Sequence, residues 1–155
     1  MTSIDTRTVI TAVFHHLFRY AYTPDETIEL IETVLTDPPR PICEIYVWDR
    51  PCRSFRDEDG PTFPGNGRVR LACPADQPWV ALNYVSFGQS GGALVDSYNP
   101  HATEDTPALL FDPEGQLFFP ASASLPLDRA REAIAEYCRT GQRPTCVQWQ
   151  PGQWY

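Results

Sequence analysis

Hydrophobic residues recur at helical spacing near the end of the chain, between residues 126 and 140. The positions between them carry mainly arginine and glutamate, so the pattern predicts an amphipathic helix with one buried face. Gly141 can adopt the left-handed conformation that ends many helices, and Pro144 prevents continuation. The buried stripe is expected to consist of Leu127, Ala130, Ile134, Tyr137 and Cys138.

Residues 145–150 follow the turn and predict a final strand that lies near its own helix. Val147 and Trp149 share one face of this strand, because successive side chains point to opposite faces. Trp149 is the largest apolar side chain of the segment, so we expect it to be a structural wedge beneath the helix.

The first forty residues predict a strand followed by a helix. β-branched residues dominate positions 8–14 and favour a strand. His15 and His16 come next, and adjacent side chains of a strand point to opposite faces, so this pair is not expected to hold one metal. Residues 23–26, Thr-Pro-Asp-Glu, provide a helix cap, a first-turn proline and a capping-box glutamate. The helix is expected to end before residue 38.

Alternating apolar positions through the middle of the chain predict six further strands. They are expected at residues 41–48, 69–73, 79–86, 93–98, 108–111 and 116–119. A glycine-rich bend joins the third to the fourth, and an Asp-Pro-Glu-Gly turn joins the fifth to the sixth, so both pairs predict hairpins. Arg68 and Arg70 alternate with apolar residues at the second of these strands, which predicts one face exposed to water.

These elements predict one α+β domain spanning residues 1–155, in which two helices pack on a mostly antiparallel sheet of about eight short strands. An apolar fraction of 42% is ordinary for a chain with a hydrophobic core. The five cysteines lack C-x-x-C spacing, which argues against a disulfide framework or a zinc ribbon. No membrane span or signal peptide is apparent, so we expect a cytoplasmic protein without metal or cofactor.

The formal net charge is −8, and all twelve basic residues are arginine. A phosphate backbone would be repelled by this balance, so a nucleic-acid partner is not expected. The same charge suits a partner protein that is itself basic, although an acidic surface can also serve only to keep a protein soluble.

Residues 49–66 are the least regular part of the chain. Long connections without regular structure are uncommon and are often functional, so this loop is a candidate contact surface. Its carboxylates Asp57, Glu58 and Asp59 could attract a basic partner from a distance. Aromatic side chains are enriched at binding hot spots, and four aromatic residues complete the set expected to bind a partner protein. They are Trp48, Tyr98, Trp154 and Tyr155.

No catalytic residue is predicted. Residues 88–92, Gly-Gln-Ser-Gly-Gly, match the G-x-S-x-G pattern of a nucleophile elbow, but that elbow needs a helix directly after the serine and here a strand is predicted. A nucleophilic Ser90 is therefore not favoured. A cysteine–histidine dyad would require the fold to bring the two residues together, which stays open at this point.

A family resemblance comes from the end of the chain. After a helix rich in alanine, arginine and glutamate, residues 143–149, Arg-Pro-Thr-Cys-Val-Gln-Trp, resemble the C-terminus of immunity protein family one of bacterial polymorphic toxin systems. Trp149 matches the C-terminal tryptophan characteristic of that family. The resemblance extends back through residues 111–120 and 79–96.

This resemblance implies a protein that binds and neutralises a toxin rather than an enzyme. Members of the family are usually encoded beside a toxin that is often a deaminase, so the implied partner is a basic deaminase or nuclease domain. Binding would block its active site or substrate groove. Two alternatives remain: a small hydrolase using Ser90 or a cysteine nucleophile, and an acidic interaction module unrelated to toxins.

Overall fold

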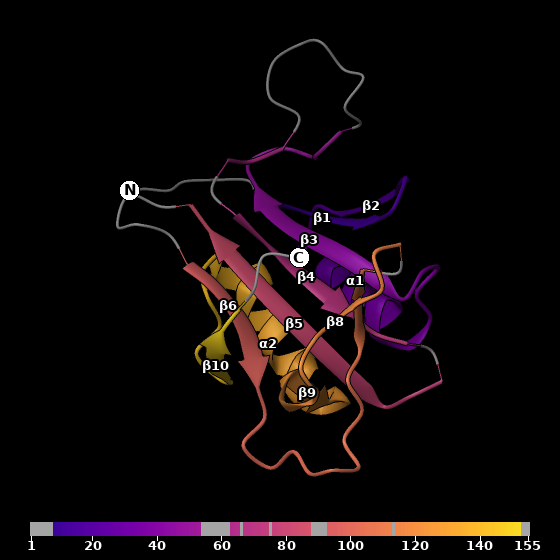
Figure 1. The fold of residues 1–155 in the computed structure, drawn as a ribbon. Coiled ribbons are helices and arrows are strands. Elements are labelled where there is room, and N and C mark those ends of the chain that lie inside the picture. Colours follow the sequence, from indigo (N-terminus) through magenta and orange to yellow (C-terminus); the bar gives the residue numbers. More distant parts are fainter. Residues whose placement is uncertain are drawn as a thin grey trace.

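The structure is a computed structural model that describes residues 8–53, 63–65, 67–74, 76–87, 93–112 and 114–152. An antiparallel sheet crosses the molecule diagonally, with both helices behind it in the view of Figure 1. The predicted α+β class, with two helices and a mostly antiparallel sheet, is confirmed. Neither helix has the length and hydropathy that crossing a membrane requires.

The strand order of the main sheet is β10-β6-β5-β4-β3-β1-β2, and β9 pairs with β5 outside this path. Strands β7 and β8 form a separate two-stranded sheet. The bounds are β1 Val9–Phe14, β2 Leu17–Ala21, α1 Pro24–Thr36, β3 Ile42–Trp48, β4 Gly67–Ala72, β5 Trp79–Ser86, β6 Ala93–Tyr98, β7 Leu110–Asp112, β8 Leu117–Phe118, the 3-10 turn η1 Ala121–Ala123, β9 Ser124–Pro126, α2 Leu127–Thr140 and β10 Gln148–Pro151.

The main core lies between the sheet and the two helices. The buried side of α2 is the predicted stripe with one change, because Ala133 is buried there and Leu127 is only half-buried. Tyr137 meets Tyr84 of β5 edge-on, with ring centroids 6.1 Å apart. Burying one apolar face of each helix against the sheet is what stabilises these short elements.

Local signals set the start of α1 as predicted. The Thr23 hydroxyl oxygen accepts a hydrogen bond from the Glu26 backbone N–H at 3.1 Å. The Glu26 carboxylate in turn accepts from the Tyr22 backbone N–H at 2.8 Å. This reciprocal pair satisfies backbone donors that the helix cannot pair internally. Between the helices, Glu32 and Arg131 form a two-point ion pair at 2.7 and 3.1 Å.

The sheet face opposite the helices is covered at one end by residues 109–123, seen in front of the sheet in Figure 1. Phe111 and Phe119 meet there, with ring centroids 5.1 Å apart, and pack on Ala72 and Ala81. This second hydrophobic cluster leaves the remainder of the face for other contacts. The sequence pattern predicted the β7–β8 hairpin but neither η1 nor β9.

Two expectations about the first half of the chain were wrong. His15 and His16 form the turn of a β1–β2 hairpin rather than part of a strand, and β2 was not predicted. His15 has φ of 60° at a turn position where glycine is usual, so the usual hairpin signal was missing. Arg68 and Arg70 do not face open water, because their side chains are only 21% and 20% exposed.

The C-terminal segment is fastened to α2 before β10 begins. Gly141 ends the helix with φ of 69°, as predicted. The Glu136 carboxylate accepts hydrogen bonds from the Thr145 backbone N–H at 2.8 Å, the Thr145 hydroxyl at 2.9 Å and the Cys146 backbone N–H at 3.2 Å. These bonds lower the pKa of Glu136 and hold residues 145 and 146 out of the strand, which therefore starts at Gln148 rather than at residue 145.

Trp149 is half-buried against the main core. Its indole N–H donates to the Pro144 carbonyl at 2.8 Å, and its ring centroid lies 6.2 Å from that of Tyr84. β10 pairs with β6, so Trp149 connects the sheet edge to the turn that follows α2.

We expect Trp149→Ala to lower the free energy of unfolding by about 3 kcal/mol, because it removes a packed aromatic ring. Trp149→Phe keeps a ring and loses only the hydrogen bond, so it should cost about 1 kcal/mol. Urea unfolding followed by circular dichroism measures both. An alanine variant as stable as the wild type would show that the ring has no structural role.

Candidate functional site

Two adjoining hollows lie on the sheet face opposite the helices, beside the second hydrophobic cluster. The apolar hollow has a volume of about 490 Å³, and the polar hollow about 670 Å³. They share Val13, His15 and Glu44, so we treat them as one groove. The apolar hollow is lined by Val13, His15, His16, Phe18, Glu44, Tyr46, Phe63, Pro64, Gly67, Arg68 and Phe87. The polar hollow is lined by Val13, His15, Arg40, Pro41, Ile42, Cys43, Glu44, Arg70, Asp112 and Glu114.

The register of the sheet places a row of polar residues across this face. Glu44 lies opposite Arg70, Arg70 opposite Asn83, and Asn83 opposite Asp96. Directly opposed side chains on one face are close enough to interact. Gln150 of β10 lies opposite Asp96 and extends the row to the sheet edge. The row therefore spans five strands, four that are consecutive in the sequence and the C-terminal β10.

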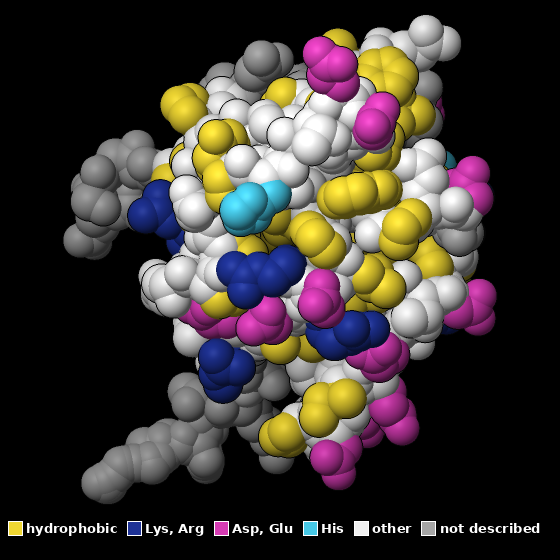
Figure 2. All heavy atoms as spheres, turned by 90° about the horizontal axis from the view of Figure 1, so that it is seen from below, with side chains coloured by type: hydrophobic (Ala, Val, Ile, Leu, Met, Phe, Trp, Pro, Cys, Tyr) yellow, Lys and Arg dark blue, Asp and Glu magenta, His cyan; other side chains and the backbone are white. Residues whose placement is uncertain are grey.

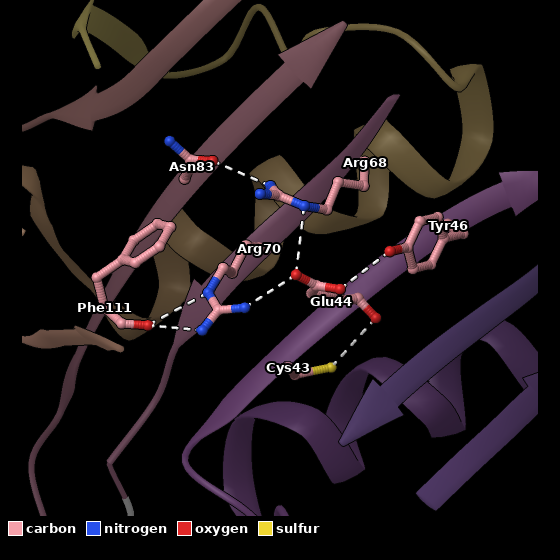
Figure 3. Close-up of polar contacts among 7 residues, drawn as sticks. All are labelled: Cys43, Glu44, Tyr46, Arg68, Arg70, Asn83 and Phe111. Atoms are coloured by element: carbon pink, nitrogen blue, oxygen red, sulfur yellow. Dashed lines mark hydrogen bonds and ion pairs between the residues drawn. The ribbon is translucent and has the colours of Figure 1, made fainter. Parts of the chain in front are cut away.

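Glu44 is the centre of the contacts drawn in Figure 3. Its Oε2 atom lies 2.9 Å from Arg70 Nη1 and 3.3 Å from Arg68 Nε. Its Oε1 atom accepts from the Tyr46 hydroxyl at 2.9 Å. One carboxylate thus holds two guanidinium groups and one phenol.

The two arginines continue the network in different directions. Arg68 donates to Asn83 Oδ1 at 3.0 Å, and the Asn83 amide donates to Asp96 Oδ1 at 2.9 Å. Arg70 donates to the Phe111 carbonyl at 2.8 and 3.2 Å, with its guanidinium carbon 4.6 Å from the Phe111 ring centroid. Arg70 consequently fastens the β7–β8 segment to the main sheet.

Burial and the Glu44 charge shift the pKa values of two members of the network. Burial raises the pKa of Tyr46, and the neighbouring Glu44 charge raises it further, so the phenol remains a neutral donor. Burial lowers the pKa of Arg68, while Glu44 opposes that change. Because these groups hydrogen-bond one another, the network forms an ordered floor for the groove.

Aromatic side chains, some exposed and some half-buried, line and adjoin the apolar hollow. Phe18, Tyr20 and Tyr22 follow one another along and beyond the edge strand β2, with successive ring centroids 6.5 and 6.2 Å apart. Phe63 lies 6.1 Å from Phe18 and 4.9 Å from Tyr46, again between ring centroids. On the rim, Phe87 is 61% exposed. Contiguous exposed aromatics of this kind are typical of protein-binding surfaces.

The cysteine thiols do not have the environment of nucleophiles. Burial raises the pKa of Cys52 and Cys73 to about 11 and that of Cys138 to about 12, and it also raises the pKa values of Cys43 and Cys146. A reactive cysteine requires the opposite shift, toward the thiolate. Ser90 lies outside the described residues. Within the described ranges, no three histidine, cysteine or acidic side chains gather closely enough to hold a metal ion.

Of the four aromatic residues proposed from the sequence, the two that lie within the described ranges, Trp48 and Tyr98, share the groove's face but are not close together. Trp48 ends β3 and is half-buried, with the guanidinium carbon of Arg50 4.9 Å from its ring centroid. Tyr98 ends β6 near the level of Ile42, the first residue of β3. At about 3.3 Å per residue, the two are separated by about 20 Å along the strands. Asp57, Glu58, Asp59, Trp154 and Tyr155 lie outside the described residues.

Sequence reasoning did not find the groove itself. The available signal was alternation: Glu44 and Tyr46 alternate with buried Cys43 and Ile45, and Arg68 with buried Val69. That alternation shows which residues of one strand share a face. It does not show that the strand with Glu44 and the strand with Arg68 and Arg70 are neighbours, or in which register they pair.

A family model described as "Immunity protein Imm1" matches residues 18–151 of the chain. The match therefore includes every strand from β3 to β10 and most of β2. No curated protein matches the chain.

We expect Glu44→Gln to destabilise the fold by about 2 kcal/mol, because two largely buried guanidinium groups would lose their counter-charge. Glu32→Gln is the matched control, since it removes an ion pair whose side chains are 39% and 43% exposed. Exposed pairs contribute at most about 1 kcal/mol. Urea unfolding measures the free energy of unfolding of both variants. Equal losses of free energy would mean that the Glu44 network contributes no more to stability than a surface ion pair does.

Proposed function

The chain belongs to the Imm1 family of immunity proteins, and we propose that it binds and neutralises a cognate polymorphic toxin whose toxic domain is a nucleic-acid deaminase. Binding covers the active site or the substrate groove of that domain. Since the substrate of such a toxin is inside the cell, the two proteins meet in the cytoplasm.

We propose the groove and the aromatic side chains beside it as the surface that contacts the toxin. The floor of the groove is ordered before binding by the contacts of Glu44 with Arg68, Arg70 and Tyr46. Ordering side chains on binding costs free energy, so a floor that is already fixed reduces this cost. The outer sides of the helices carry the exposed carboxylates Asp25, Glu26, Glu29, Asp128 and Glu132, and acidic residues are depleted at interface centres.

Charge supports a basic partner. A toxin that acts on nucleic acid must present a basic cleft, and a chain of net charge −8 attracts such a surface over a distance. Figure 2 shows basic and acidic side chains interspersed with hydrophobic ones on one face of the molecule. The groove, which faces the viewer in Figure 1, also combines apolar and charged side chains, so contacts there involve shape and apolar area as well as the overall charge.

We expect inhibition to be stoichiometric. Toxin activity on a nucleic-acid substrate should fall linearly as the chain is added and reach its minimum near one molecule per toxin molecule, because binding without turnover consumes one inhibitor for each toxin. Ser90→Ala should protect as well as the wild type. A different result would identify a hydrolase instead. In that case much less than one molecule of the chain per toxin molecule would protect fully, and Ser90→Ala would abolish protection while leaving the fold intact.

A further inference from the structure

The two halves of the groove differ in the chemistry they offer. The apolar hollow has walls of Val13, Phe18, Tyr46, Phe63, Pro64 and Phe87. Among the described residues that line it, the carboxylate of Glu44 and the guanidinium group of Arg68 form an ion pair at 3.3 Å. This half therefore offers aromatic contact area around a locally neutral floor, which suits a large uncharged side chain.

The described residues that line the whole groove carry as many arginines as carboxylates, but these charges are unevenly placed. The Glu44 carboxylate is already shared by Arg68 and Arg70, so the polar hollow adds Arg40 on the basic side and Asp112 and Glu114 on the acidic side. Arg70 is held by Glu44 and by the Phe111 carbonyl. Asp112 and Glu114 thus outnumber Arg40 at the mouth of this half.

The acidic pair at the mouth is ordered by the turn that it belongs to. Asp112 Oδ1 accepts a hydrogen bond from the Glu114 backbone N–H at 3.0 Å, which fixes the half-buried Asp112 side chain. The Glu114 side chain is exposed and available to a partner. A cationic side chain entering this half would find two carboxylates within one short turn.

The hollows adjoin at Val13, His15 and Glu44, so one continuous segment can fill both. We propose that the groove binds a segment of the toxin in which a large apolar side chain stands next to, or two residues from, an arginine or lysine. The apolar side chain occupies the hollow rimmed by Phe87, and the cation lies against Asp112 and Glu114. Residues two apart in an extended segment point to the same side and are about 7 Å apart, which suits adjoining hollows.

This inference rests on the proposed function, because the occupant is part of the toxin. A nucleic acid is the other charged occupant to consider, and the excess of carboxylates at Asp112 and Glu114 opposes it.

The test is isothermal titration calorimetry of the whole chain against the catalytically inactivated toxic domain encoded beside its gene. Phe87→Ala probes the apolar half and Glu114→Gln the polar half. Both side chains are exposed, so neither change should disturb the fold. The matched controls are Phe118→Ala, 55% exposed, and Glu104→Gln, also exposed, neither of which lines the groove.

We expect Phe87→Ala to raise the Kd about tenfold or more, as loss of an aromatic anchor does. Glu114→Gln should raise it about fivefold at 0.1 M salt and less at 1 M, where the Debye length has fallen from about 10 Å to about 3 Å. Both controls should stay within about twofold of the wild type, as residues outside a hot spot do.

Each other outcome has a distinct meaning. If the wild type binds the toxin but Phe87→Ala and Glu114→Gln match their controls, the groove is not the contact surface and the inference is overturned, while the proposed function stands. A large effect of Phe87→Ala with none of Glu114→Gln overturns the cationic half of the inference. Absence of any complex with the wild type overturns the proposed function itself. Binding of a short single-stranded oligonucleotide in the groove, abolished by Phe87→Ala, would replace the protein segment by a nucleic acid.

Discussion

One carboxylate, that of Glu44, is shared by two arginines, and the helix-free face of the sheet depends on this arrangement. Arg68 and Arg70 stand on β4 beside Glu44 of β3, and each reaches on to a further element, Asn83 of β5 or the Phe111 carbonyl of β7. Largely buried cations are tolerated only when paired. The register of β3, β4 and β5 is therefore fixed from both sides, by the core on one face and by the ion pairs on the other.

The two faces of the sheet consequently have different roles. The helix face carries the larger hydrophobic core. The opposite face is divided between a second cluster around Phe111 and Phe119 and the groove that begins where this cluster ends. On the proposed contact surface, substitutions at the groove's exposed rim would alter recognition at little cost in stability. This separation suits an immunity protein, whose specificity must follow that of its toxin.

Local sequence signals predicted the elements well, whereas the groove depended on pairing between distant strands. The α1 capping box, the stripe and terminal glycine of α2, and both predicted hairpins are present. Arg68 and Arg70 were wrongly expected to face water. Their partner Glu44 lies about 25 residues earlier, and no local sequence pattern shows that the strands carrying these residues pair with each other. β2 was missed because a histidine takes the turn position at which glycine is usual. The candidate acidic loop residues and the two C-terminal aromatics lie outside the described residues.

The central claim is that the toxin covers the groove and leaves the helix side free. Hydroxyl-radical footprinting of the complex, read by mass spectrometry, measures this side chain by side chain. We expect oxidation of Phe87, His15 and His16 to fall on binding, while that of Ile28, 62% exposed on α1, stays unchanged. Protection of Ile28 with unaltered oxidation of Phe87 and the two histidines would place the toxin on the helices and contradict the account.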